Sequence, residues 1–198
     1  MIITISRQFG SSGRKLAKIL AEKLGYSYYD KEILQEIAKQ SSLDETYVEK
    51  ILNTPQTFLY STGCTLSYSL MHKHTSDIFS IQQKIFNTLA EKGNAIFVGR
   101  GAEVLLNNYN PFKIFVYSTL DKRLQRVLEN AKPTENTNPK VMLKKIKNID
   151  KARIKTCSLL GFKWGRKENY DLCVSTEKIC PEDLADILCD YIKKLKTE

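Results

Sequence analysis

The stretch ITISRQFGSSGRKLAKILAEKLG, residues 3–25, is the part of the chain that decides the fold. It opens on a short apolar run, IITIS at 2–6, which predicts a buried strand. A glycine-rich bend follows. Apolar residues then recur at helical spacing from Gly13 to Leu24, and Gly25 is a natural stop. Strand, glycine bend and helix in this order build a phosphate-binding loop, because the amides at the start of a helix direct partial positive charge at the bend.

The loop matches the phosphate-binding pattern G-x-x-x-x-G-K-S/T incompletely. With the second glycine at Gly13, Gln8 stands at the first glycine. Arg14 then replaces the lysine and Lys15 the hydroxyl residue. Because arginine can bind phosphate through two parallel hydrogen bonds, we expect Arg14 or Arg7 to supply the loop cation. The residues expected to bind donor phosphates are Gly10, Ser11, Ser12, Gly13, Arg14 and Lys15. The alternative is a plain turn with solvent-facing cations.

The composition indicates a globular chain with a basic surface. Its 198 residues suit one domain, and 42% hydrophobic with 27% charged residues is an ordinary balance. Lysine and arginine number 31 against 22 acids, which gives a net charge of +9 and favours anionic partners. Because the basic residues are spread along the chain, small phosphates rank above nucleic acid as partners, and a merely solvated basic surface is the alternative.

The sequence predicts a cytoplasmic protein with no membrane partner. No apolar run approaches the length that spans a bilayer, and the amino terminus lacks a basic start followed by an apolar stretch. The five cysteines are scattered without a C-x-x-C pair, which favours reduced thiols over disulfides or a zinc site. The histidines of MHKH (71–74) lack a nearby third ligand, so no metal site is expected there.

Four more strands are predicted, at YSYYD (26–30), NAIFVGRG (94–101), FKIFVYS (112–118) and YDLCVST (170–176). Five short apolar strands separated by helices predict an α/β fold with a parallel sheet and helices on both faces. Ligands of such folds bind at the carboxyl ends of the strands.

We expect a single domain, 1–198, with two insertions. Residues about 31–92 are too many for a simple crossover and predict a helical insertion, in which Ser42 is the expected cap of a second helix. Residues about 132–168 predict a second, lid-like insertion. The core is then formed by residues 1–30, 93–131 and 169–198.

Three blocks of the sequence resemble the cytidylate kinase-like family, relatives of cytidylate kinase among the P-loop nucleoside monophosphate kinases. They are ITISRQFGSSGRKLAKILAEKLGYSYYDKEIL (3–34), AIFVGRGAEVLL (95–106) and IDKARIKTCSLLGFKWGRKENYDLCVST (149–176). The blocks occur in order over nearly the whole chain. The resemblance implies a P-loop kinase fold in which the first insertion binds a monophosphate acceptor and the second is the lid.

The resemblance also implies acceptor-binding roles for two residues. Cytidylate kinase has an Asp-Gly-Arg-Asp run after its third strand, and its arginine holds the phosphate of CMP. The run here is Val-Gly-Arg-Gly (98–101), so Arg100 matches while both aspartates are absent. Asp30 matches an aspartate after the second strand, but the residues that follow differ from the CMP pocket of the relative. Asp30 either holds Mg²⁺ through water or caps the next helix.

In the lid, Arg153 matches the family's lid arginine and, with Arg14, is the expected catalytic residue. Lid arginines stabilise the charge of the transferring phosphoryl group once water is excluded. A basic helical face that is only solvated is the alternative. Arg123 and Arg126 lie where relatives place a lid-hinge arginine.

The implied reaction moves the γ-phosphoryl group of ATP, with Mg²⁺, to a nucleoside monophosphate, CMP by default. Ser12 and Asp30 are the candidate Mg²⁺ ligands. Two alternatives stay open: a kinase for a different small acceptor, and a non-catalytic nucleotide-binding or regulatory protein. The first is favoured by the altered residues after Asp30. The second is favoured by the missing P-loop lysine and hydroxyl and by the missing aspartates on either side of the Gly-Arg pair at 99–100.

Overall fold

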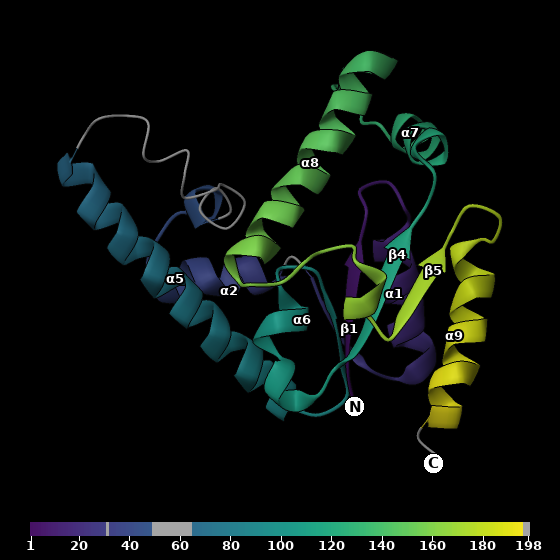
Figure 1. Ribbon diagram of the computed structural model, residues 1–198, viewed down its shortest axis with the longest axis horizontal. Helices are drawn as coiled ribbons and strands as arrows, with labels where there is room; N and C mark the ends of the chain where they lie inside the picture. Colours follow the sequence, from purple (N-terminus) through teal and green to yellow (C-terminus); the bar gives the residue numbers. More distant parts are fainter. Residues whose placement is uncertain (31, 49–64, 196–198) are drawn as a thin grey trace.

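The computed structural model describes residues 1–30, 32–48 and 65–195. At its centre is a five-stranded sheet in the order β2-β3-β1-β4-β5 (Figure 1). Each neighbouring pair of strands is parallel, which confirms the predicted sheet. The strands are β1 (Ile2–Arg7), β2 (Ser27–Tyr29), β3 (Ala95–Val98), β4 (Phe112–Tyr117) and β5 (Leu172–Ser175). The opening strand β1 is thus the central one, between β3 and β4.

Helices pack on both faces of the sheet, and alternate residues of β3 contribute to the core on each face. Successive side chains of a strand point to opposite faces. Ala95 and Phe97 therefore join one core cluster, with residues of α2, α5 and α6, while Ile96 and Val98 join the other, with α1 and α9. These helices are α1 (Gly13–Leu24), α2 (Glu32–Ser41), α5 (Thr65–Glu91), α6 (Ala102–Leu105) and α9 (Pro181–Leu195).

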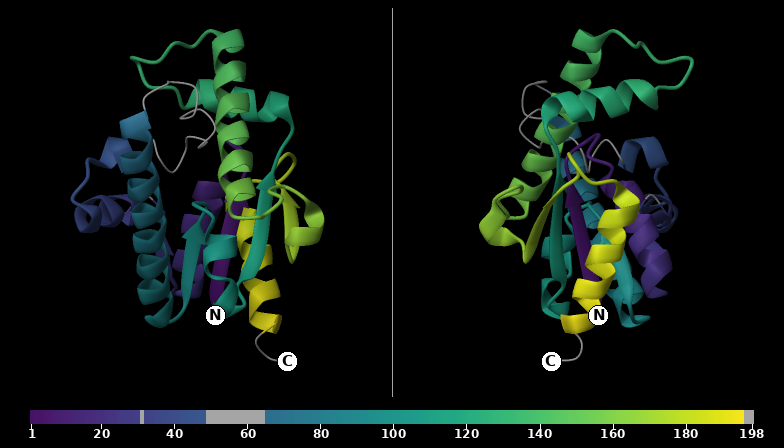
Figure 2. Two further views of the ribbon diagram at one scale, coloured as in Figure 1. Left: turned by 60° about the vertical axis from the view of Figure 1, so that its left-hand side comes forward. Right: turned by 90° about the vertical axis from the view of Figure 1, so that its right-hand side faces the viewer.

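Two further helices stand at the end of the sheet toward which the strands point (Figure 2). They are α7 (Leu120–Glu129) and the long α8 (Pro139–Leu159). Asn138 caps α8, since its side chain accepts a hydrogen bond from the Lys140 amide at 2.9 Å, and Pro139 occupies the first turn. Short 3₁₀ turns lie at Asn107–Tyr109 and Lys167–Asn169. The carboxyl edge of the sheet is thereby covered by α8 and α7.

One local prediction is wrong. Ser42 does not cap the helix that begins at Glu45, because Ser42 adopts a left-handed φ of 54° just after α2 ends. Asp44 caps this helix instead, accepting hydrogen bonds from the amides of Thr46 and Tyr47 at 2.9 and 3.2 Å.

The remaining expectations concern thiols, histidines and membranes. Cys157, Cys173, Cys180 and Cys189 are free thiols, and Cys64 lies outside the described residues. The two histidines of residues 71–74 fall in the part of α5 whose side chains are outside the description. None of the helices in the described ranges combines the length and the apolarity that crossing a bilayer requires.

Candidate functional site

The loop between β1 and α1 is shaped by one glycine and one strained serine. Gly10 has a φ of +79° and packs against α7, where an added Cβ would lie 2.9 Å from the carbonyl oxygen of Arg123. Ser12 adopts a left-handed φ of 58° and is the N-cap residue of α1. The first-turn amides of α1, at Gly13, Arg14 and Lys15, have no helical carbonyl to bond and open at this end of the helix. The loop therefore has the backbone of an anion site.

The two neighbouring serines of the loop have different surroundings. Ser11 is buried, and its hydroxyl donates to the Gln8 carbonyl at 2.9 Å. The Ser11 carbonyl accepts a hydrogen bond from the Thr176 hydroxyl at 2.8 Å, which ties the loop to the end of β5. Ser12 makes no capping hydrogen bond and lines a cavity. Of the two serines, Ser12 is the one in the cavity wall.

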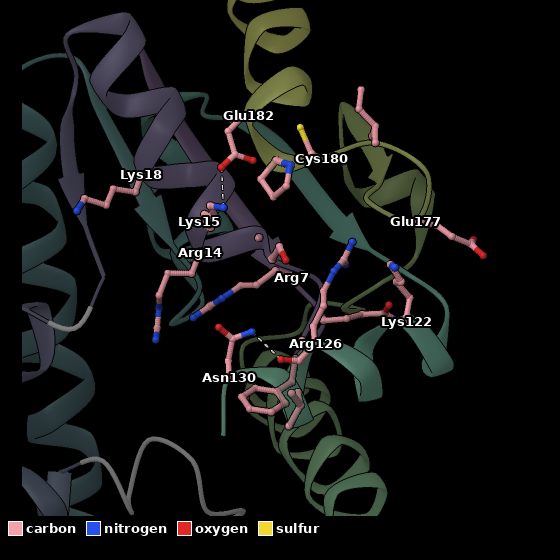
Figure 3. Close-up of a pocket in the computed structure, with 18 of the residues that line it drawn as sticks. Arg7, Arg14, Lys15, Lys18, Lys122, Arg126, Asn130, Glu177, Cys180 and Glu182 are labelled. Atoms are coloured by element: carbon pink, nitrogen blue, oxygen red, sulfur yellow. Dashed lines mark hydrogen bonds and ion pairs between the residues drawn. The ribbon is translucent and has the colours of Figure 1, made fainter. Parts of the chain in front are cut away.

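The cavity, of about 1130 Å³, extends from the loop between α7, α8 and the start of α9 (Figure 3). Its wall contains ten cationic side chains and three carboxylates. The cations are Arg7, Arg14, Lys15, Lys18, Lys122, Arg126, Lys132, Lys145, Arg153 and Lys178. The carboxylates are Glu135, Glu177 and Glu182. Such an excess of positive charge in a concave site attracts anions, and polyphosphates above all.

Arg14 and Arg7 extend toward the same carboxylate, that of Asp30 at the end of β2. Arg14 bonds Asp30 through Nε and, at 3.3 Å, through Nη2, while Arg7 Nη2 lies 3.6 Å from Asp30 Oδ1. The Asp30 side chain is 5% exposed, whereas that of Arg14 is 53% exposed. The Tyr28 hydroxyl donates to Asp30 at 3.4 Å, and burial raises the pKa of Tyr28 to about 12. Asp30 thus holds one arginine that can also reach solvent and ligand.

The Val-Gly-Arg-Gly run after β3 makes room for Arg7. Gly99, Arg100 and Gly101 all have left-handed φ values, of 67°, 61° and 71°. A Cβ on Gly99 would lie 1.6 Å from Arg7 Nη1, so the guanidinium of Arg7 passes directly over this glycine. Burial lowers the pKa of Arg7 to about 10, against the opposing effect of Asp30. The Arg100 carbonyl accepts a hydrogen bond from Gln82 Nε2 at 2.8 Å, which joins the run to α5.

Lys15 points away from Asp30 and toward α9. Its Nζ lies 2.6 Å from Glu182 Oε1, and both side chains are largely exposed (Figure 3). Lys15 therefore lines the cavity as half of a surface ion pair, which contributes little to stability because water screens it.

Arg153 reaches the loop from α8. Its Nη1 donates to the Arg7 carbonyl at 2.6 Å, and its guanidinium lies 5.9 Å from the centre of the Phe9 ring. Burial, and then the charge of Arg7, lower the pKa of Arg153 to about 9. The two other candidate arginines also form hydrogen bonds near the loop. Arg123 donates to the Phe9 carbonyl, and Arg126 donates to the Thr176 hydroxyl.

Most of the predicted site residues lie in the wall of the cavity. They are Arg7, Gly10, Ser12, Gly13, Arg14, Lys15 and Arg153. Ser11, Asp30 and Arg100 are not among the wall residues. Asp30 adjoins the cavity through Arg14 and Arg7. Sequence reasoning did not single out Asp150, which bonds both Arg123 and Arg153. Its one visible signal is the spacing of three to Arg153, which places both on one face of a helix.

The resemblance implies Mg²⁺ beside ATP, and the residues present can be compared with what this ion needs. Mg²⁺ prefers oxygen ligands, keeps several waters and is commonly bound through few side chains together with phosphates. Ser12, a cavity-wall residue whose side chain makes no capping hydrogen bond, fits such a site. Asp30 is engaged by Arg14 and Arg7, so it fits only after exchange. No group of three His, Cys, Asp or Glu side chains in the described ranges is placed to hold a metal.

Residues 2–178 match the family model described as the cytidylate kinase-like family, and the chain belongs to this family. The match confirms the resemblance seen in the three sequence blocks. A cytidylate kinase from Sulfolobus acidocaldarius is 24% identical over 199 residues, which cover 98% of this chain and 95% of that protein.

Solved structures confirm the expected P-loop kinase fold. An uncharacterized protein from Eubacterium ventriosum is 28% identical, with a TM-score of 0.72 and 98% of both chains covered. Shikimate kinase from Bacteroides thetaiotaomicron is 14% identical, with a TM-score of 0.57 and again 98% of both chains covered. Shikimate kinase from Acinetobacter baumannii is 15% identical, with a TM-score of 0.52 over 100% of this chain and 95% of that one. Family and fold together support a nucleotide-binding phosphotransferase.

Proposed function

We propose that the protein transfers the γ-phosphoryl group of ATP, taken with Mg²⁺, to a nucleoside monophosphate, with CMP as the first acceptor to test. The observation that carries this proposal is the cavity at the start of α1, whose wall has ten cations against three carboxylates. A polyphosphate is the ligand that such a wall and a helix N-terminus favour together. The cytoplasm, where ATP and nucleoside monophosphates occur together, is the proposed location.

The donor phosphates would lie against the loop between β1 and α1, the opening loop of the chain. The first-turn amides of α1 supply fixed partial charges, and Arg14 adds a guanidinium that can bind two phosphate oxygens at once. Because Arg14 forms an ion pair with Asp30, the phosphates compete with this carboxylate for it. The half-exposed position of the Arg14 side chain supports such an exchange. Magnesium neutralises phosphate charge when bound, and Ser12 is the residue proposed beside it.

The acceptor would bind on the other side of Arg7, toward β2 and β3. We propose residues 31–92 as the acceptor-binding insertion, with Arg100 as the clamp on the acceptor phosphate and Asp30 beside it. The support is the position of both residues at carboxyl ends of neighbouring strands, which pair in register. Residues 132–168 are proposed as the lid, and Arg153 on α8 as the arginine that stabilises the transferring phosphoryl group.

The test is a coupled assay of ADP release with ATP, Mg²⁺ and a panel of acceptors: CMP, UMP, AMP, GMP and shikimate. We expect saturable ADP release that depends on a nucleoside monophosphate and is fastest with CMP. Release with shikimate alone among these acceptors would assign a different kinase activity. Variants lacking the Arg14 guanidinium serve as the matched background, since contaminating kinases are unaffected by this change.

A second candidate function, nucleotide binding without turnover, is favoured by one specific observation. Both loop cations that follow Gly13 already have carboxylate partners, Arg14 with Asp30 and Lys15 with Glu182. A loop whose cations are balanced in this way can hold a nucleotide without activating it. ATP binding by calorimetry, together with no ADP release for any acceptor in the panel, would select this function.

A further inference from the structure

Asp150 lies where the loop, α7 and α8 meet. Its Oδ1 accepts hydrogen bonds from the Phe9 amide at 2.8 Å and from Arg153 Nη1 at 3.3 Å. Its Oδ2 accepts one from Arg123 Nη1 at 2.5 Å. Phe9 belongs to the opening loop and Arg123 to α7, while Asp150 and Arg153 belong to α8. One carboxylate of α8 therefore joins this helix to the neighbouring helix α7 and to the loop, which lies 141 positions earlier in the sequence.

The two arginines that bond Asp150 also bond backbone carbonyls, one at the end of β1 and one in the loop. Arg123 Nη1 donates to the Phe9 carbonyl at 3.2 Å, and Arg153 Nη1 donates to the Arg7 carbonyl at 2.6 Å. The amide and the carbonyl of Phe9 are thus both bonded within this cluster. Because each bond involves a charged side chain, these contacts are stronger than neutral hydrogen bonds. The loop is therefore bonded both to α7 and to α8.

Arg123, Asp150 and Arg153 form a charged cluster with little exposure, in which Asp150 balances the charge of both arginines. The exposed fractions of the side chains are 9% for Arg123, 13% for Asp150 and 23% for Arg153. Burial and the neighbouring Arg7 lower the pKa of Arg153, whereas Asp150 raises it. Cations this buried are costly unless a carboxylate accompanies them. Asp150 supplies that charge for Arg123 and Arg153 together.

Asp150 contacts the cavity only indirectly, through residues of the wall to which it is bonded. Phe9 and Arg153 belong to the cavity wall, and Asp150 is not among the wall residues. A change at Asp150 therefore alters the site by moving Arg153 and the loop, without removing a group from the cavity surface.

We propose that Asp150 is a positioning residue that fixes Arg153 and the opening loop in one arrangement before any ligand binds. Donors that are already in place at a developing charge need no reorganisation during the reaction. The consequence for catalysis rests on the proposed phosphotransferase function. The proposed fixation of the loop is testable without turnover.

The variants are Asp150→Asn, which keeps the shape and removes the charge, and Asp150→Glu, which keeps the charge and changes the reach. Asp121→Asn, at the exposed start of α7, is the matched control. The first readout is amide hydrogen exchange at Phe9 in the ligand-free protein, resolved by NMR. We expect Phe9 exchange to rise about tenfold or more in Asp150→Asn, less in Asp150→Glu, and not in the control.

The second readout is the split between kcat and ATP affinity. We expect kcat to fall about ten- to a hundredfold in Asp150→Asn while the Kd for ATP changes about threefold or less, with partial recovery in Asp150→Glu. If Asp150→Asn does not fold, Asp150→Glu carries both readouts, with faster Phe9 exchange and reduced kcat expected.

Two results would overturn the proposal: Phe9 exchange that stays at the wild-type rate in the folded variants, or equal losses of kcat and ATP affinity. A wild-type protein that releases no ADP refutes the proposed function instead. The exchange readout then still tests the role of Asp150.

Discussion

Two clusters of the same composition flank the opening loop, and they are built differently. In each, one carboxylate with little exposure bonds two arginines: Asp30 with Arg7 and Arg14, and Asp150 with Arg123 and Arg153. Around Asp150 both arginines also bond backbone carbonyls, Arg153 at the end of β1 and Arg123 in the loop. Around Asp30 one arginine, Arg14, has a side chain that is 53% exposed.

This contrast between the two clusters indicates which arginine can change partners. Arg14 can leave Asp30 for a phosphate at small cost, because solvent already surrounds half of it. Arg123 and Arg153 are held by backbone and carboxylate together, so leaving would expose several unpaired groups. We therefore regard the Asp30 cluster as exchangeable on ligand binding and the Asp150 cluster as fixed.

The largest expected effect is on stability, when one arginine is removed from each cluster. Arg123→Ala leaves a buried carboxylate short of a partner and should lower the free energy of unfolding by about 3–5 kcal/mol. Arg14→Ala should lower it by about 1 kcal/mol or less, because its ion pair is half exposed. Urea unfolding can be followed by the fluorescence of Trp164, the single tryptophan, which packs edge-on against Phe115. Equal losses for the two variants would abolish the distinction between the clusters.

The next effect is on ATP binding and separates the two loop cations. Arg14→Ala should weaken ATP binding by about 1.5–3 kcal/mol, roughly ten- to a hundredfold, the value of a charge-assisted contact. Lys15→Ala should weaken it clearly less, because its ammonium group is directed to Glu182. Calorimetric titration of both variants gives the comparison. A larger loss for Lys15→Ala would mean that the loop is offset by one residue from the phosphate-binding pattern.

A smaller effect, confined to the acceptor, is expected at the end of β3. Arg100→Ala should raise the KM for the acceptor about tenfold while ATP binding persists, since only one contact to the acceptor phosphate is lost. Arg100→Lys should recover part of this loss, because charge survives and the two-pronged geometry does not. Steady-state kinetics with varied CMP measure the effect. Unchanged acceptor kinetics in Arg100→Ala would remove this residue from the site.

The smallest effect tests the exchange itself. Asp30→Asn frees Arg14 from its carboxylate, so ATP alone should bind about two- to fivefold more tightly, within the value of a partly exposed ion pair. Asp183→Asn, a change of the same kind near the start of α9, serves as the control. Weaker ATP binding in Asp30→Asn would show that Asp30 supports the nucleotide rather than competing with it.

The sequence predicted the parallel sheet and the loop because both rest on local, periodic signals. Apolar strands, glycine bends and amphipathic helices each show as a pattern among neighbouring residues. The order of these patterns along the chain is enough to place a phosphate-binding loop at the start of α1. The pairing of Arg14 with Asp30 could not be predicted in the same way, since it depends on how β2 is placed beside β3.

The contacts of Asp150 and the contrast between Ser11 and Ser12 were also beyond sequence reasoning. Phe9 and Asp150 are 141 positions apart, and no periodic pattern encodes a hydrogen bond over that distance. The two serines are chemically identical, yet Ser11 is buried and bonds the Gln8 carbonyl whereas Ser12 lies in the cavity wall. Such contacts follow from tertiary packing, which overrides what single residues suggest.

A calorimetric titration of the wild-type protein with ATP and Mg²⁺, at low and at moderate salt, tests whether the opening loop is a nucleotide site. We predict saturable binding at both, weaker at moderate salt because part of the attraction is screened. No binding heat at either salt concentration, confirmed by equilibrium dialysis, would contradict this prediction. Residues 3–25 would then form a strand, a turn and a helix with no role in nucleotide binding.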